Sequence, residues 1–405
     1  MSKIEQLIQQ YCPDGVEWVK LVDVCDKVCS GGTPSRGKGD YFTGNIPWLR
    51  TQEVDWKDVY DTEIKITEEA VINSSAKIIP ENCVIVAMYG ATAGKVCINK
   101  ISLTTNQACC NLQINPHKAH YKFVYYCVCN EYENIKSLGQ GSQNNINAQI
   151  VKNYLIPLPP LPVQEEIVKI LDTFSELQAE LQAELQARQQ QYQYYRDKLL
   201  SFEGRDDVEW KKLGDISSIK TGRRFVRTDI RESGVPCFHY GDIYTYYGLT
   251  ATKTKGYLDA ELASKLRFAQ PNDVVVVCAG ENDWDLGVGV AWLGDEPAVV
   301  HDACCILHHN QNPRYISHFL RTHNYHLQMR RYVKNGKISS LPSSALAEAL
   351  IPIPSLEEQE RIATILDRFD TLVNDLSQGL PAEIEARRQQ YEYYRDKLLS
   401  FKKKA

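Results

Sequence analysis

The chain has 405 residues, of which 46 are Lys or Arg, 51 are Asp or Glu and nine are His, so its formal charge is −5. This balance excludes a protein coated with basic residues for general nucleic-acid binding, and 23 Tyr with six Trp exclude a low-complexity disordered chain. At roughly 100–200 residues per domain, the length predicts two or three domains, each with its own core.

The first residues contain no long apolar run of the kind found in signal peptides, and the longest purely aliphatic run is Val274–Val277. We therefore expect a cytoplasmic protein. The thirteen Cys are scattered and include the adjacent pairs Cys109-Cys110 and Cys304-Cys305. In a chain without an export signal they are expected to be reduced thiols, mostly buried as small hydrophobic residues.

The first part of the chain predicts a mixed α+β domain. Short apolar stretches bounded by turn residues predict buried strands at Cys83–Gly90, Lys95–Asn99 and Gln107–Ile114, and a helix is expected at Tyr121–Asn134.

Two glycine-rich stretches of this domain match phosphate-binding loops only in part. In Gly32–Lys38 the next residue is Gly39, where a Mg²⁺-binding Ser or Thr is required, and Gly90–Lys95 is one residue too short. The CxxxC and CxC pairs, Cys25 with Cys29 and Cys127 with Cys129, lack the His spacing of a zinc site, so buried thiols are the favoured interpretation. No catalytic residue and no metal ligand is predicted.

A proline-rich stretch, Pro157–Pro162, precedes a long predicted helix at Val163–Phe202, which would be roughly 60 Å long. Apolar residues recur in steps of three and four with one four-residue stutter, which is typical of a coiled-coil seam. Within it, Glu176–Ala187 is three consecutive copies of Glu-Leu-Gln-Ala.

The second part repeats this plan. Strands are expected at Asp273–Gly280, Val288–Leu293 and Asp302–His308, followed by a helix at Ile316–Tyr332. After Pro352–Ile353–Pro354 comes a second long helical segment, in which Gly379 and Pro381 predict a kink or a frayed turn.

The two helical segments are near-identical in sequence. Ala187–Phe202 reads ARQQQYQYYRDKLLSF and Ala386–Phe401 reads ARRQQYEYYRDKLLSF, at an offset of 199. Upstream motifs align at offsets of 195 and 192, so the chain is a tandem duplication. We divide it into domain 1 (1–156), a first helical spacer (157–206), domain 2 (207–354) and a second helical spacer (355–405), and expect the two helices to pack antiparallel.

Two cationic loops stand at nearly the same point of each half, Ser30–Lys38 and Lys220–Arg227. Arg beside Gly, Ser, Thr and aromatic residues suits approach to phosphates and base edges. A solvated loop is an equally good interpretation of these residues alone. The first spacer is the most acidic segment, with five basic and nine acidic residues.

The pattern as a whole resembles the specificity subunits of type I restriction-modification enzymes, in particular the subgroup with tandem tetrapeptide repeats in the central helix. The motifs that carry the resemblance span the whole chain: Val16-Glu-Trp18 with Leu21 and its copy at Val208, Ser30–Ser35, Ile66–Pro80, the Ile-Pro-Leu-Pro and Gln-Glu-Glu-Ile motifs before and in the first helix with their copies in the second, and the duplicated Tyr-Tyr-Arg-Asp-Lys-Leu-Leu-Ser-Phe.

The resemblance implies two target-recognition domains, each reading one half of a split DNA sequence. It also implies that two modification (methyltransferase) subunits dock on the duplicated helices and that restriction (motor-nuclease) subunits then join. S-adenosylmethionine, ATP and Mg²⁺ would be used by those partners. The chain lacks the Asn/Asp-Pro-Pro-Tyr/Phe motif of an amino-methyltransferase, so it is expected to be non-catalytic and to bind none of these cofactors itself.

Residue type and loop position suggest DNA contacts. In domain 1 we predict Arg36, Lys38, Arg50, Gln52, Tyr89, Thr92 and Asn106, and in domain 2 Arg223, Arg224, Arg227, His239, Tyr240, Asn282 and Trp284. Partner docking is predicted at Gln164, Glu165, Tyr192, Tyr195, Gln359, Glu360, Tyr391 and Tyr394, although inward-facing Tyr could equally fill the seam between the helices.

Two further expectations concern layout. The tetrapeptide number should set the length of the unread gap between the half-sites. The first residues, from Ile4, should lie beside the end of the C-terminal helix near Phe401, because the equivalent stretch of the second half follows a helix directly. The main alternative function is a coiled-coil scaffold or tether that binds proteins rather than DNA; a self-sufficient DNA methyltransferase is a weaker alternative.

Overall fold

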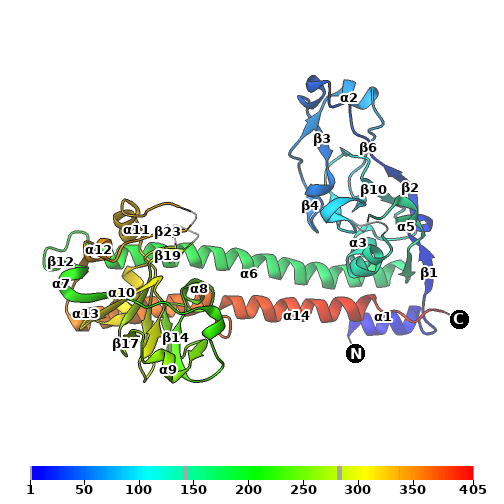
Figure 1. Cartoon of the computed structure of the whole chain (residues 1–405). Helices are drawn as coiled ribbons and strands as arrows, with labels where there is room; N and C mark the ends of the chain where they lie inside the picture. Colours follow the sequence, from blue (N-terminus) through cyan, green and yellow to red (C-terminus); the bar gives the residue numbers. More distant parts are fainter. Residues whose placement is uncertain (1, 140–144, 281–284, 337, 405) are drawn as a thin grey trace. The chain divides into compact units, whose positions relative to one another are not determined.

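The computed structural model describes residues 2–139, 145–280, 285–336 and 338–404. The chain divides into two compact units: unit 1 comprises Met1–Ala179 with Ala386–Ala405, and unit 2 comprises Glu180–Glu385 (Figure 1). Each unit holds one globular domain together with helical segments from both copies of the repeat. Within the described ranges, no helix is long and apolar enough to cross a membrane.

Unit 1 contains two main sheets. A five-stranded sheet has the order β2-β10-β7-β8-β4, and a four-stranded sheet has the order β5-β3-β9-β6. Neighbouring strands are antiparallel except for the pairs β4–β8 and β3–β9. The strands are β2 (Cys25–Ser30), β3 (Ile46–Leu49), β4 (Asp58–Val59), β5 (Lys65–Ile66), β6 (Ile78–Ile79), β7 (Val84–Ala87), β8 (Val96–Asn99), β9 (Leu103–Thr105) and β10 (Cys109–Ile114).

Every residue of β7 and β8 is buried, which explains why these strands are continuous apolar runs rather than alternating ones. Phe123 and Val124 of α3 (Tyr121–Asn130) pack in one core cluster with Val84 and Val96 of the sheet. The other short helices and the two-stranded ribbon of unit 1 are α1 (Lys3–Tyr11), α2 (Glu68–Ile72), α3 (Tyr121–Asn130), α4 (Tyr132–Ser137), α5 (Ala148–Asn153), β1 (Glu17–Lys20) and β11 (Leu155–Leu158).

Unit 2 has the same two sheets with the same connectivity. The five-stranded order is β13-β22-β18-β20-β15 and the four-stranded order is β16-β14-β21-β17. The strands are β13 (Ser217–Thr221), β14 (Val235–Phe238), β15 (Thr250–Ala251), β16 (Gly256–Leu258), β17 (Phe268–Ala269), β18 (Val274–Val277), β20 (Gly289–Trp292), β21 (Ala298–Val300) and β22 (Cys304–His309). Position by position these orders match those of unit 1, so the tandem duplication extends through the globular domains.

The remaining elements of unit 2 are short. Two ribbons pair β12 (Glu209–Lys212) with β24 (Leu350–Ile353) and β19 (Ala279–Gly280) with β23 (Ser339–Ser340). The helices are α7 (Leu213–Ile216), α8 (Tyr240–Thr245), α9 (Ala260–Ala263), α10 (Pro313–Phe319), α11 (His323–Arg330) and α12 (Ser343–Ala347). The helical stretches expected at Tyr121–Asn134 and Ile316–Tyr332 each consist of two helices. In the second stretch, Thr322 leaves helical geometry and caps α11.

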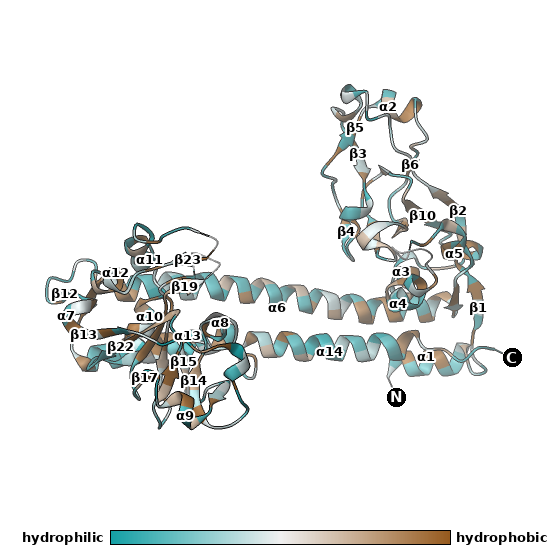
Figure 2. Ribbon diagram, in the orientation of Figure 1, coloured by the Kyte–Doolittle hydropathy of each residue, from teal (hydrophilic) through white to brown (hydrophobic). Residues whose placement is uncertain are grey.

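The first spacer is one uninterrupted helix, α6 (Leu161–Ser201), which begins in unit 1 and ends in unit 2. In Figure 2 hydrophilic residues dominate α6 and α14 (Leu380–Leu399), with hydrophobic residues recurring along them. In unit 1 the Phe174 ring of α6 stacks on Tyr394, with ring centroids 5.5 Å apart. In unit 2 the Phe369 ring stacks on Tyr195 of α6 at 5.7 Å. Phe174 and Phe369 occupy equivalent positions of the two repeats, and so do Tyr195 and Tyr394. In each contact the Phe of one repeat stacks on the Tyr of the other, as expected for two antiparallel helices.

The second spacer is not one helix. It consists of α13 (Leu356–Asn374) and α14 (Leu380–Leu399), separated by residues 375–379. Asp375 Oδ1 accepts hydrogen bonds from the backbone of Ser377 and Gln378 and closes the turn. A side chain at Gly379 would lie 2.4 Å from the Thr371 carbonyl oxygen. The break between α13 and α14 agrees with the kink or frayed turn expected from Gly379 and Pro381.

The start and the end of the chain meet in unit 1. Val16 N donates to Lys402 O at 2.9 Å, and Lys404 N donates to Val16 O at 2.9 Å. Ile4 shares a core cluster with Leu398 and Leu399, against which Phe401 also packs. The expected circular layout is therefore confirmed. All thirteen cysteines are free thiols, and ten of them are buried.

Candidate nucleic-acid interface

Five strand ends of unit 1 lie at one edge of its sheets. Strands β2, β7, β3 and β9 finish there and β10 begins there. The connecting backbones are bonded to one another: Gly32 N donates to Thr105 O at 2.9 Å, Asn106 N to Leu49 O at 2.9 Å, and Met88 N to Ala108 O at 2.8 Å. We call the loops at this edge the first loop edge. It carries the predicted residues Arg36, Lys38, Arg50, Gln52, Tyr89, Thr92 and Asn106.

Most side chains of the first loop edge are held by neighbours. Arg50 forms ion pairs with Glu53, at 3.4 Å, and with Glu63. Thr92 Oγ1 donates to the Thr51 carbonyl at 2.8 Å, which ties two short 3-10 turns, η3 (Thr51–Glu53) and η4 (Gly90–Thr92). These contacts position the loops and neutralise the charge of Arg50.

Three predicted residues of this edge face solvent more freely. Lys38 lies over the Tyr41 ring, 4.9 Å from its centroid, and donates to the Tyr41 hydroxyl at 3.0 Å, a contact that raises the pKa of Lys38. Tyr89 is 42% exposed. Arg36 is exposed, and its side chain makes no hydrogen bond or ion pair with any part of the chain that the structure covers.

The same edge exists in unit 2, and we call it the second loop edge. Gly222 N donates to Cys304 O at 2.9 Å, Arg223 N to Val300 O at 3.0 Å, and His301 N to Phe238 O at 3.1 Å. Arg223, Arg224, Arg227, His239 and Tyr240 are thereby brought together. The predicted Asn282 and Trp284 lie outside the described residues.

Parallel strands β14 and β21 end side by side, with Phe238 opposite Val300, so the residues that follow them are neighbours. The His239 and His301 rings are 4.8 Å apart between centroids, and Tyr240 lies 5.3 Å from His301. The Phe225 ring packs edge-on against His301 at 5.1 Å. Burial and electrostatic repulsion from His301 and Arg227 lower the pKa of His239, and burial also lowers the pKa of His301. Both rings are therefore neutral near pH 7.

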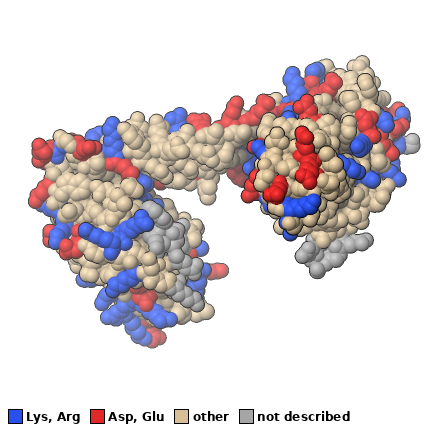
Figure 3. Space-filling model, turned by 90° about the horizontal axis from the view of Figure 1, so that it is seen from above, with Lys and Arg blue, Asp and Glu red and all other residues tan. Residues whose placement is uncertain are grey.

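His301 was missed by the sequence analysis, although a signal for it exists. It aligns with the predicted Asn106 at the offset of 195 that also aligns Ala108-Cys-Cys110 with Ala303-Cys-Cys305. The globular parts of the two units differ in surface charge. On the face shown in Figure 3, several Lys and Arg lie together on the globular part of unit 2, whereas basic and acidic residues alternate on that of unit 1.

Two of the predicted docking residues have an internal role instead. Gln164 and Gln359 are fully buried. Gln164 Oε1 accepts from His120 N at 2.8 Å, and Gln359 Oε1 accepts from Asn312 N at 2.9 Å. Their amide nitrogens donate to the backbone carbonyls of the preceding proline-rich stretches. Assigning these glutamines to a docking surface was wrong, because both ends of each amide are occupied inside the protein.

The predicted tyrosines divide into an inner and an outer pair. Tyr192 is 5% exposed and Tyr391 is partly buried, and both rings lie in the seam between the helices. Tyr195 and Tyr394 are each 37% exposed, and their neighbours Tyr194 and Tyr393, which we did not predict, are 58% and 60% exposed. Of the predicted glutamates, Glu165 is exposed and Glu360 is bound to Arg314 and Asn312.

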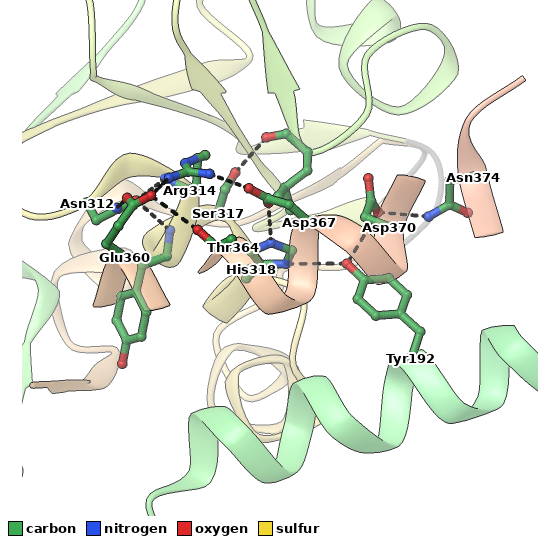
Figure 4. Close-up of polar contacts among 12 residues, drawn as sticks. Tyr192, Asn312, Arg314, Ser317, His318, Glu360, Thr364, Asp367, Asp370 and Asn374 are labelled. Atoms are coloured by element: carbon green, nitrogen blue, oxygen red, sulfur yellow. Dashed lines mark hydrogen bonds and ion pairs between the residues drawn. The ribbon is translucent and has the colours of Figure 1, made fainter. Parts of the chain in front are cut away.

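A polar network joins α10 of domain 2 to the helical part of unit 2 (Figure 4). Arg314 Nη1 donates to Asp367 Oδ2 at 2.5 Å, and His318 Nε2 lies 2.8 Å from Asp367 Oδ1. Tyr192 of α6 contacts His318 Nδ1 and donates to Asp370 Oδ1, both at 3.3 Å. Burial opposes ionisation of Asp367, but the hydrogen bonds and charges of His318 and Arg314 outweigh it and lower the pKa of Asp367.

Unit 1 has the equivalent junction with different groups. Lys122 Nζ donates to Asp172 Oδ2 at 2.6 Å, and the Tyr126 hydroxyl donates to Asp172 Oδ1 at 2.7 Å. In each unit, an aspartate of a spacer helix therefore anchors a helix of the globular domain through two donors. The junctions hold each globular domain against the spacer helices of its unit.

Comparison with known proteins agrees with this architecture. The chain is 35% identical over 299 residues to the EcoR124I/EcoR124II specificity subunit of Escherichia coli, covering 71% of this chain and 72% of the relative. It is 30% identical over 400 residues to the EcoprrI specificity subunit of Escherichia coli, covering 93% of this chain and 92% of the relative.

Solved structures share the fold across nearly the whole chain. A chain from a study of complex assembly and conformational transition in a type I R-M system has a TM-score of 0.66 at 18% identity, covering 96% of this chain and 98% of that one. The type I S subunit from M. genitalium has a TM-score of 0.54 at 16% identity, covering 95% and 96%. The family model for the type I restriction modification DNA specificity domain matches residues 13–188 and 205–386. Since that model matches both halves of the duplication, the chain belongs to the type I restriction-modification DNA specificity family.

Proposed function

We propose that this chain is the DNA specificity subunit of a type I restriction-modification complex and recognises a split DNA target. Domain 1 reads one half-site through the first loop edge, and domain 2 reads the other through the second loop edge. The chain itself performs no chemistry. S-adenosylmethionine, ATP and Mg²⁺ belong to the modification and restriction subunits that assemble on it.

The observation that carries the proposal is the duplication of one loop edge on two separate domains. Each edge gathers basic and aromatic side chains at the ends of the same set of strands, and the first edge also carries amide side chains. Such groups supply the phosphate and base-edge contacts that DNA readers use. Two readers of different sequence on one chain explain why a target would have two unlike halves with unread base pairs between them.

Docking of two modification subunits is the second part of the proposal. The outer tyrosine pairs, Tyr194 with Tyr195 and Tyr393 with Tyr394, are equally exposed in the two copies of the repeat. Aromatic side chains of this kind are enriched at protein interfaces. A duplicated surface suits two copies of one partner, and the restriction subunits join the complex that they form.

Mapping methylated adenines genome-wide tests the function directly. Cells that contain the modification subunit, with and without this chain, are compared by sequencing that detects N6-methyladenine. A bipartite methylated motif that requires this chain is the expected result. A chain that binds its partners but leaves the methylation pattern unchanged would favour the scaffold alternative.

A further inference from the structure

The second loop edge carries hydrogen-bond donors that have no internal partner. Arg224 and Arg227 are both exposed, and among the residues covered by the structure neither guanidinium makes a hydrogen bond or an ion pair. Arg223 differs, because its Nη1 donates to the Lys265 carbonyl at 2.8 Å. The edge therefore presents two guanidinium groups to solvent at a point where the backbone is held by strand ends.

Arg227 and His239 converge on one spot, Gly241. A Cβ atom built on Gly241 would lie 3.2 Å from Arg227 Nη2 and 3.6 Å from His239 Nδ1. The N–H of Gly241 donates to His239 Nδ1 at 3.3 Å, so the neutral ring carries its proton on Nε2. Both side chains at this spot are therefore donors.

Two carboxylates near this spot are already engaged. Asp242 is paired with Lys255 at 3.0 Å, and Asp229 accepts from Val226 N at 2.8 Å. These two carboxylates therefore leave the guanidinium groups of Arg224 and Arg227 unpaired. At the first loop edge Arg36 is also unpaired, but Arg50 is neutralised by two glutamates, and the same edge carries the amide side chains of Gln52 and Asn106.

In the major groove, guanine is the base that presents two acceptors, N7 and O6, and arginine pairs with both. Adenine presents one acceptor and one donor, which matches an amide side chain instead. We propose that Arg227, with His239 beside it, reads a guanine in the half-site recognised by domain 2. The inference rests on the proposed function and names guanine as a base that domain 2 selects.

The test uses the full chain assembled with its modification subunits and duplexes that contain the mapped target. Each guanine of each half-site is replaced in turn by 7-deazaguanine, which lacks the N7 acceptor. The expected result is one position, in one half-site, at which the wild-type complex binds roughly tenfold more weakly. Arg227→Gln should weaken binding to the natural duplex by a similar factor and should no longer respond to 7-deazaguanine at that position.

Arg331→Gln is the matched control, because it removes the same charge from an exposed residue that follows α11 in the same unit. It should keep the response to 7-deazaguanine. Gly241→Ala is a second variant that leaves Arg227 in place but crowds its guanidinium, and it should reduce the same response. If the thermal midpoint shows that Arg227→Gln is misfolded, Gly241→Ala provides the test instead.

The outcomes separate the two levels of the argument. A wild-type complex with no sequence preference for DNA would overturn the proposed function. If the complex selects its target but responds to 7-deazaguanine at no position, the guanine assignment is wrong while the function stands. Retention of the full response in both Arg227→Gln and Gly241→Ala would likewise overturn the assignment to Arg227.

Discussion

Asn106 in unit 1 and His301 in unit 2 occupy the same position of the duplicated domain and make the same turn. Asn106 Oδ1 accepts a hydrogen bond from Ala108 N at 3.2 Å, and His301 Nδ1 accepts one from Ala303 N at 3.1 Å. Side chains of different chemistry thus fix the same backbone. The backbone turn at each loop edge is therefore the same in both units, while the side chain available to a ligand at this position differs.

Replacement of His301 should separate its two roles. His301→Asn keeps an acceptor for Ala303 N, so its free energy of unfolding should exceed that of His301→Ala by about 1 kcal/mol. Both variants lose the ring contacts with Phe225 and His239, so recognition of the domain 2 half-site should change. Urea denaturation measures the first effect and methylated-adenine mapping the second. A change in both half-sites would contradict the assignment of one half-site to each domain.

Gln359 should matter for stability and not for docking. Gln359→Ala leaves the backbone N–H of Asn312 and the carbonyl of Pro354 without their buried partner, which should cost about 1–3 kcal/mol of unfolding free energy. Arg368→Ala, an exposed change on the same helix, is the control. The measurement is the urea midpoint together with the affinity for the modification subunit. A weakened affinity at unchanged stability would restore Gln359 to the docking surface.

The elements that sequence could predict are those with exact copies or strong periodicity. The duplication and the meeting of Ile4 with Phe401 follow from comparing one repeat with the other, the coiled-coil seam follows from its periodicity, and the break near Gly379 follows from Gly379 and Pro381. The equal strand orders of the two domains could not be predicted, because many of those strands are two to four residues long and share little sequence. Their register is set by tertiary packing rather than by local propensity.

The errors in the candidate sites have one physical cause. Gln164 and Gln359 are equivalent residues of the two halves. Such recurrence does not show whether a side chain bonds buried backbone groups or lies on a contact surface. Residue type has the same limit, since it selected Arg50, whose charge is neutralised by Glu53 and Glu63. His301 was missed because it differs in residue type from Asn106, so only the offset of 195 shows that the two positions are equivalent.

Unit 2 should be more sensitive to acid than unit 1. Burial lowers the pKa of one histidine in unit 1, His120, and of five in unit 2: His239, His301, His309, His318 and His326. For His326 the value falls from 6.5 to about 4. A histidine with a lowered folded pKa binds fewer protons in the folded state, so its contribution to stability is complete above pH 6.5 and is lost as pH falls toward the folded pKa.

Hydrogen exchange of the full chain at pH 7.5 and pH 5.5, corrected for intrinsic rates, checks this. Peptides from unit 2 should lose more protection than those from unit 1, by about 1 kcal/mol or more. His318→Gln removes one contributor and should shrink the difference. Equal losses in the two units would show that the buried histidines of unit 2 do not govern its stability.

The tetrapeptide run of α6 should set the gap between the half-sites. Deleting one Glu-Leu-Gln-Ala unit from Glu176–Ala187 removes about 6 Å of helix, against about 3.4 Å per base pair along one strand. The seam can absorb part of the change, because Leu185 and Leu380 share a core cluster and the non-helical residues 375–379 lie just before Leu380. Both half-sites should therefore stay the same while the unread gap shortens by about one base pair. Methylated-adenine mapping reads half-sites and gap together, and an unaltered gap would show that α6 does not act as the ruler.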